Sequence, residues 1–264
     1  MMESFVDEVK EGLENNQFVL YYQPIIQGWS GSIIGLEALI RWQHPKRGLL
    51  LPKDFIPAIE KSKWIYQIGE WVLKEACEQY KIWQIAGFPS FRIAVNISAR
   101  HFLSKHFVKG VFEMLRNIEL EPSCLEIEVT ELSLLREIHQ ASHVLQSLKE
   151  SGIQIALDDF GTGYNSLSYL KNLSFDRLKI DRSFIQDLPR NKKVKEIVSF
   201  MINLAHQLNL EVTAEGVETE DVLCLLNKEG CDCVQGYLIS KPLPRKEVEE
   251  FLLSHSQLAQ MTFF

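Results

Sequence analysis

Acidic and amide side chains recur in short segments where apolar and polar residues alternate. These segments carry Glu37, Asn96, Glu128, the adjacent pair Asp158 and Asp159, and Glu215. Five carboxylates gathered in one pocket repel one another unless cations lie among them. Oxygen ligands suit hard cations such as Mg²⁺ and Mn²⁺. If the fold brings these residues together, they predict a site for divalent metal ions.

The adjacent acids Asp158 and Asp159 suggest two ions, because one carboxylate can bridge two cations while its neighbour binds one. Two ions about 4 Å apart form a clamp for phosphodiester hydrolysis, in which they stabilise the phosphoryl oxygens and lower the pKa of a bound water. Lys179 would position that water or stabilise the developing charge. Arg41 shares a strand face with Glu37 and would hold a phosphate.

Any one of these acids, taken alone, is better explained as half of a structural ion pair. A shared site becomes the better explanation when several polar residues end different strands and all face inward. The residues in question are Asn96, Glu128, Asp158, Lys179, Glu215 and Gln235. A shared site therefore requires that these strands close into a barrel.

Apolar segments and longer segments of helical spacing alternate along the 264 residues. The predicted strands are 18–26, 33–42, 91–96, 125–130, 153–158, 177–181, 211–215 and 233–238. The predicted helices are 5–14, 64–85, 104–118, 138–151, 166–172, 193–208, 220–229 and 245–253. This alternation predicts an α/β protein, a (β/α)₈ barrel of the TIM type, with no second domain.

The connection between the first two predicted strands is short and contains two glycines, within residues 26–32. A parallel crossover needs roughly a dozen residues or more. The first strand is therefore predicted to be antiparallel, in a hairpin with the second. A turn near residue 30 would place Gln23 opposite Glu37, with a slip of one residue still open.

Side chains alternate along a strand, so each strand presents two different faces. In the segment 125–130, Glu126 and Glu128 oppose three apolar residues, and three later segments alternate in the same way. The apolar faces should pack on the helices while the polar faces look into the barrel. The polar residues concentrate at the C-terminal strand ends, where barrel enzymes keep their active sites.

The composition restricts the possible partners and the compartment. Lys and Arg total 28 against 35 Asp and Glu, a formal net charge of −7. This argues against polymeric nucleic acid but leaves open a small nucleotide held through metal ions. No apolar run reaches the roughly 18 residues of a membrane span, and residues 1–16 lack the features of a secretory signal. Five cysteines, an odd number, favour free thiols in a reducing compartment, so we expect a cytoplasmic protein.

Several weaker patterns have more ordinary explanations. Residues 159–161 match the magnesium tripeptide of kinases, but the accompanying kinase motifs are missing. His139 and His143 have metal-ligand spacing without a third ligand, so we expect an exposed helix face. The cysteines are expected in the core or lining the barrel, with metal binding as the alternative.

A longer run of residues resembles a known family. The segment Gly35-Leu36-Glu37-Ala38-Leu39-Ile40-Arg41-Trp42 resembles the signature of EAL domains, bacterial phosphodiesterases that act on cyclic di-GMP. Further motifs follow in order: Val95-Asn96-Ile97-Ser98, Glu128-Val129-Thr130-Glu131, Asp158-Asp159-Phe160-Gly161-Thr162-Gly163-Tyr164, Leu178-Lys179-Ile180-Asp181 and Ala214-Glu215-Gly216-Val217-Glu218. The chain is thus identified as a single EAL domain over residues 1–264, with a core of about 17–254, a short N-terminal helix and a C-terminal tail.

The resemblance implies hydrolysis of cyclic di-GMP to linear pGpG through a metal-activated water, with two Mg²⁺ or Mn²⁺ ions. The implied metal ligands are Glu37, Asn96, Glu128, Asp158, Asp159 and Glu215. The implied catalytic residues are Lys179, Glu37, Glu215 and Asp159. The implied substrate-binding residues are Gln23, Leu39, Arg41, Asn96, Asp181 and Gln235. The fold implied is a (β/α)₈ barrel with its first strand antiparallel.

The resemblance also implies a control element. Glu131 would anchor the loop 159–166, which in this family links the metal site to a dimer interface. The loop and dimer residues are Glu131, Gly161, Thr162, Gly163 and Glu218. A homodimer is expected, together with a regulatory or sensor partner. The chain departs from the family at Asn165, where serine is common, and at His101, where glutamine is usual; neither is a metal ligand.

Two other functions compete with the phosphodiesterase. One is a receptor that binds cyclic di-GMP, cleaves it weakly or not at all, and signals through dimer or partner contacts. The other is a scaffold that acts only by protein contact. Degenerate relatives of the receptor kind usually lack a metal ligand or the lysine, and no such residue is missing here.

Overall fold

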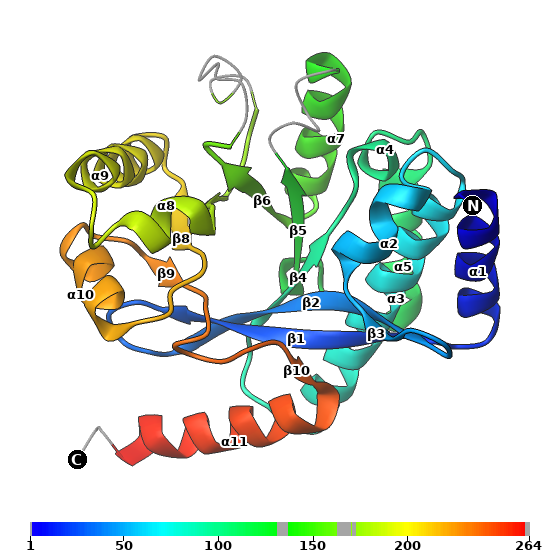
Figure 1. Ribbon diagram of the computed structural model, residues 1–264, viewed down its shortest axis with the longest axis horizontal. Coiled ribbons are helices and arrows are strands. Elements are labelled where there is room, and N and C mark those ends of the chain that lie inside the picture. The colour runs from blue at the N-terminus through cyan, green and yellow to red at the C-terminus, as the bar shows by residue number, and fades with distance from the viewer. Residues whose placement is uncertain (1, 131–136, 163–169, 171–172, 262–264) are drawn as a thin grey trace.

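A computed structural model describes residues 2–130, 137–162, 170 and 173–261 (Figure 1). The strands are β1 Phe18–Gln27, β2 Ile33–His44, β3 Gly48–Leu50, β4 Arg92–Asn96, β5 Leu125–Thr130, β6 Gln154–Phe160, β7 Arg177–Ile180, β8 Glu211–Ala214, β9 Cys233–Val234 and β10 Leu243–Pro244. The helices are α1 Met2–Glu14, α2 Pro52–Ile59, α3 Trp64–Ile85, α4 Ala99–Phe102, α5 Phe107–Ile118, α7 Ile138–Glu150, α8 Arg182–Asp187, α9 Lys192–Gln207, α10 Glu220–Lys228 and α11 Arg245–Met261. Among the described residues no helix has the length and apolar character needed to cross a membrane.

Eight of the strands close into a barrel. The order is β1, β2, β4, β5, β6, β7, β8 and β9, and β9 pairs back onto β1. β1 runs antiparallel to both of its barrel neighbours, and the other barrel pairs are parallel. Figure 1 shows β1 and β2 crossing below the upright strands β5 and β6, with helices on both sides. The predicted barrel with a reversed first strand is confirmed.

The hairpin register is also confirmed. Gln23 pairs with Glu37, and the register shifts only beyond them, between Ile25 and Ile26. In the turn Gly31 has φ +71°, a left-handed backbone that glycine adopts without steric cost. The first pair of strands therefore holds two predicted site residues side by side.

The apolar strand faces pack outward beneath the helices, as predicted. On β5, Leu125, Ile127 and Val129 are all buried in the main core. Each such side chain contributes about 1.5–3 kcal/mol when it leaves water. The outer face therefore stabilises the barrel, and the inner face is left free to carry polar groups.

Most of the predicted helices and strands agree with the structure to within a few residues. Two predicted ends are wrong: α11 continues to Met261 rather than ending at 253, and β9 ends at Val234 rather than at 238. The helix predicted at 166–172 lies outside the described residues apart from Leu170. The short helices α2, α4 and α8 were missed, because a few turns show little periodicity and depend on caps and packing. Ser98 caps α4, and Asp181 caps α8. All five cysteines are free, but Cys224 is exposed, so its expected place in the core is wrong.

Candidate functional site

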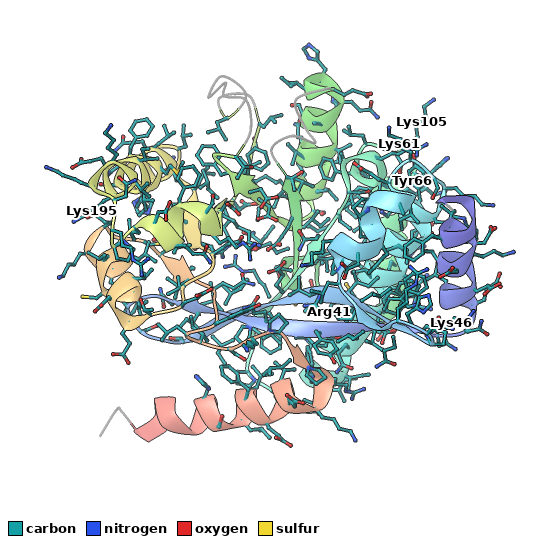
Figure 2. The ribbon with its side chains drawn as sticks, in the orientation of Figure 1. Arg41, Lys46, Lys61, Tyr66, Lys105 and Lys195 are labelled. Carbon is teal, nitrogen blue, oxygen red and sulfur yellow. The ribbon has the colours of Figure 1, made fainter. Side chains whose placement is uncertain are left out.

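The inward side chains at the C-terminal ends of the strands meet around Lys179. Its Nζ lies 2.7 Å from Glu128 Oε2 and 2.7 Å from Glu215 Oε1. Asp158 Oδ1 and Glu37 Oε2 follow at 3.6 Å and 3.7 Å. Carboxylates from β2, β5 and β6, and one from the residue directly after β8, therefore meet at one lysine from β7. Figure 2 shows nitrogen- and oxygen-bearing side chains gathered in the space between β5 and β8.

Amide groups hold the other side of the cluster. Asn96 Nδ2 donates to Glu37 Oε1 at 2.6 Å, and Gln235 Nε2 donates to Glu37 Oε2. Gln235 Nε2 also lies 3.0 Å from Gln23 Oε1, and Gln23 Nε2 donates to the carbonyl oxygen of Ser240 at 3.0 Å. These hydrogen bonds fix the orientation of the Glu37 carboxylate.

The adjacent acids Asp158 and Asp159 lie on the same side of the chain, although neighbouring strand residues normally point to opposite faces. Asp159 has φ +55°, and its N–H donates to Asp158 Oδ1 at 2.9 Å. Carboxylate oxygens of Asp158, Asp159 and Glu215 lie within 4.8 Å of one another. A left-handed aspartate costs of order 1–3 kcal/mol, a strain typical of functional sites.

The electrostatics of the cluster favour bound protons when no cation is present. Burial and then the Glu37 charge raise the pKa of Glu128 well above its usual range. Burial likewise raises the pKa of Glu215 to about 8 and that of Asp159 to about 6. Burial also acts to raise the pKa of Glu37, but Lys179 and the amide hydrogen bonds leave it below its ordinary value. Burial acts to lower the pKa of Lys179, and the surrounding carboxylates outweigh it and raise that pKa well above the ordinary value.

The donor set fits a divalent cation. Among the described residues, Glu128 Oε1 and Gln235 Oε1 are buried without a hydrogen-bond partner. A buried carboxylate oxygen without a partner is costly, and a cation would satisfy it. Carboxylates and an amide oxygen are the ligands that Mg²⁺ and Mn²⁺ prefer.

A cavity of about 720 Å³ opens beside the cluster rather than over its centre. Leu39, Asn96 and Asp159 form its wall toward the barrel, and apolar residues of α2 and α3 form the opposite wall. Arg41, labelled in Figure 2, is buried on β2, donates to the carbonyl oxygen of Ile40 and has its guanidinium carbon 5.5 Å from the Tyr21 ring centre. The site thus combines a polar cluster with an apolar recess.

The remaining predicted residues lie farther from Lys179. Asp181 accepts a hydrogen bond from the N–H of Ser183 and helps to raise the pKa of Asp159, after burial and Asp158. Thr162 Oγ1 donates to the Asp159 carbonyl at 2.8 Å.

Gly161 and Glu218 were also predicted to control the loop or the dimer. Gly161 has φ +95°, and a Cβ there would collide with Met201 and Phe184. Glu218 is exposed and accepts from Gln186 at 3.4 Å. Glu131 and Gly163 lie outside the described residues, so their predicted roles stay predictions.

Two features were not assigned a role from the sequence. The apolar wall from α2 was missed because that helix was missed. Arg177 was placed on the inward face of its strand but given no function, although the alternation of Arg177 with Lys179 was a usable signal.

Comparison with known proteins agrees with the site geometry. The EAL domain family matches residues 6–242. The bifunctional diguanylate cyclase/cyclic di-GMP phosphodiesterase MucR of Pseudomonas aeruginosa is 44% identical over 241 residues, which are 91% of this chain and 35% of MucR. The cyclic di-GMP phosphodiesterase NbdA of the same organism is 43% identical over 249 residues, 94% of this chain and 32% of NbdA. The chain therefore spans about a third of the length of these relatives.

Solved structures similar to this chain also come from EAL proteins. The PaMucR phosphodiesterase in complex with c-di-GMP superimposes with a TM-score of 0.89 at 43% identity, over 93% of this chain and 99% of that one. The EAL enzyme Bd1971, bound to cAMP and cyclic di-GMP, gives 0.88 at 32% identity, over 94% and 70%. With the family match, these similarities show that the chain belongs to the EAL domain family.

Proposed function

We propose that this chain is a metal-dependent phosphodiesterase that hydrolyses cyclic di-GMP to linear pGpG with Mg²⁺ or Mn²⁺. The observation that carries the proposal is the buried cluster of carboxylates around Lys179, in which one oxygen of Glu128 has no partner among the described residues. The two named relatives carry the same activity in their names.

Each part of the site has a proposed task. Glu37, Asn96, Glu128 and Asp158 would hold one ion, and Asp158 and Asp159 the second, with Glu215 beside them. Divalent cations there would stabilise charge on the phosphoryl oxygens and lower the pKa of the attacking water.

The positively charged residues and the β1–β2 hairpin would bind the substrate and orient the attacking water. Lys179, which contacts Glu128 and Glu215, would orient the water by a hydrogen bond and offset negative charge as it develops. Gln23 and Arg41 would hold the phosphate and sugar groups, and the apolar recess lined by Leu39 would take a guanine base. Asp181 and Gln235 would complete the substrate contacts.

Partners form a second part of the proposal. We expect the EAL domain to act as a homodimer, and Ile197 and Phe200 of α9 support this with an exposed apolar stripe. Light scattering on the purified chain tests it, and a monomer at all concentrations would refute it. The matched residues are 35% of MucR and 32% of NbdA, so most of each relative lies outside the EAL domain, and we also propose a regulatory or sensor partner for this domain.

The activity test is direct. The purified chain is incubated with cyclic di-GMP and either Mg²⁺ or Mn²⁺, and pGpG is followed by chromatography. Glu37→Gln should abolish turnover, whereas Glu113→Gln, the same change at an exposed position on α5, should leave it intact. Binding of cyclic di-GMP by folded protein without cleavage in either metal would favour the receptor instead.

A further inference from the structure

The barrel interior holds a second charged group, centred on Arg177, on the N-terminal side of the carboxylate cluster around Lys179. The side chain is 2% exposed. Its Nε donates to Glu126 Oε2 at 3.1 Å, and its Nη2 donates to Glu211 Oε2 at 2.8 Å. Its Nη1 donates to Thr213 Oγ1 at 3.0 Å and to Cys233 Sγ at 3.1 Å. One guanidinium therefore bonds to β5, β8 and β9 from its own strand, β7.

The residues in this group have a regular relation to the site above them. Glu126, Arg177, Thr213 and Cys233 each precede a site residue by two positions, namely Glu128, Lys179, Glu215 and Gln235. Residues two apart on a strand point to the same face and lie roughly 6.6 Å apart along it. On β5 and β7, one contact of the Arg177 group and one site residue therefore share the inward face, and Glu215 and Gln235 directly follow the ends of β8 and β9.

We propose that Arg177 is a positioning residue for the metal and water site: it holds four strands at the relative heights that bring Glu128, Lys179, Glu215 and Gln235 together. Arginine suits this task because its planar fork directs several donors at fixed angles, which a lysine ammonium does not. The water and the metal ions would be held by the residues above it, and Arg177 would act only through its hydrogen bonds to Glu126, Glu211, Thr213 and Cys233.

An ion pair that only stabilises the fold is the competing explanation. A structural pair would change the melting temperature when removed but leave the site geometry unchanged. A positioning residue changes the metal affinity and kcat as well, because the ligands no longer converge. Loss of a partner that orients metal ligands typically costs about 10–100-fold in metal affinity or activity.

A matched control lies at the same end of the barrel. Arg92 also approaches this group, with Nη2 3.4 Å from Glu211 Oε2 and Nε 3.9 Å from Glu126 Oε2. Its side chain is 27% exposed and it starts from β4 at the edge of the group. Arg92→Lys therefore makes the same chemical change at a side chain whose contacts are longer and more exposed to solvent.

The test compares Arg177→Lys with Arg92→Lys and the unchanged chain. Mn²⁺ affinity is measured by titration calorimetry and by the electron spin resonance of bound Mn²⁺, alongside melting temperature, kcat and KM. We expect Arg177→Lys to lose about tenfold or more in Mn²⁺ affinity and in kcat, with KM little changed. Arg92→Lys should retain both. A variant Arg177→Lys that melts earlier yet keeps Mn²⁺ affinity, spectrum and kcat would overturn the proposal.

Milder variants keep the test decisive if Arg177→Lys does not fold. Thr213→Val and Cys233→Ala each remove one hydrogen-bond acceptor of Arg177. Each should weaken Mn²⁺ binding by a smaller factor than Arg177→Lys does. Unchanged Mn²⁺ affinity in both variants would refute the positioning role. The expected loss of kcat rests on the proposed function, but the expected loss of Mn²⁺ affinity does not. An unchanged chain that binds Mn²⁺ and forms no pGpG would refute the phosphodiesterase and still allow the Arg177 test.

Discussion

Lys179 and Glu128 form an enclosed pair, with Nζ 2.7 Å from Oε2 and side chains 1% and 0% exposed. The pair uses only one oxygen of Glu128, and Oε1 has no partner among the described residues. A buried carboxylate with one oxygen free suits a metal ligand better than a closed structural bridge. The site is thus arranged to receive a cation at a cost to the metal-free protein.

The first prediction concerns Glu128 itself. Glu128→Gln should leave the metal-free melting temperature little changed, because burial and the Glu37 charge already favour the neutral acid at Glu128, and the amide is a close neutral substitute. It should also abolish the rise in melting temperature on adding Mn²⁺. Glu126→Gln on the same strand should lower the melting temperature of the metal-free protein. Its free energy of unfolding should fall by about 1–3 kcal/mol, because Arg177 loses a charged partner. Scanning calorimetry checks both, and a large destabilisation by Glu128→Gln would contradict the account.

The second prediction is a dependence of Mn²⁺ binding on pH. Glu215 has a pKa of about 8 and Asp159 one of about 6, both raised first by burial. Metal must displace these protons, so Mn²⁺ affinity should rise from pH 6 to pH 8. Calorimetry in buffers of different ionisation heat should also detect proton release. An affinity that is flat or falling across this range would argue against these carboxylates as ligands.

The same raised pKa values predict the stability of the metal-free protein. An acid with a raised pKa contributes stability below its ordinary pKa, and this is lost as the pH rises through the folded value. The melting temperature should therefore fall as the pH passes from 6 to 9, through the titration of Glu215. Glu215→Gln should flatten that fall, and a melting temperature that climbs over this range in both proteins would count against it.

The third prediction concerns Gly69 of α3, where a Cβ would collide with the buried His101 ring. Gly→Ala inside a helix normally stabilises by about 0.5–1 kcal/mol. At Gly69 the collision should make the substitution destabilising instead, and the free energy of unfolding should fall by about 1–3 kcal/mol. Gly110→Ala on α5 is the matched control, because nothing lies within 4 Å of its Cβ position. Denaturant unfolding should show stability recovered in Gly69→Ala/His101→Ala, and equal effects of the two single changes would refute the packing argument.

The fourth prediction separates substrate binding from metal binding. Arg41→Met should raise KM for cyclic di-GMP by about tenfold, worth ~1.4 kcal/mol, and leave Mn²⁺ affinity unchanged. Arg47→Met, at an exposed position in the turn that follows β2, is the control and should change neither. Steady-state kinetics with calorimetry checks this, and a loss of Mn²⁺ affinity in Arg41→Met would assign Arg41 to the metal site.

Much of the fold was predictable from local patterns. Alternation placed Glu128 and Lys179 on inward faces, and the short connection after β1 placed Gln23 opposite Glu37. Asp159 shows the limit of that reasoning: simple alternation points it away from Asp158. Its left-handed backbone brings the two carboxylates together, a conformation that residue patterns do not encode. The presence of two adjacent acids, and then the resemblance to EAL domains, pointed to Asp159; alternation along the strand did not.

Other features depend on tertiary contacts. The α2 wall of the recess comes from a helix too short to show a clear period, and Gly69 matters only because His101 packs against it. The role proposed for Arg177 follows from four acceptors on three strands that meet only in the closed barrel.

The most direct test of the central claim is hydrolysis of cyclic di-GMP in H₂¹⁸O, followed by mass spectrometry of the product. With Mg²⁺ or Mn²⁺ present, the account predicts pGpG whose new phosphate oxygen carries the ¹⁸O of water, and no product after chelation of the metal. Absence of pGpG from folded, metal-loaded protein, or cleavage that continues in the chelator, would contradict it.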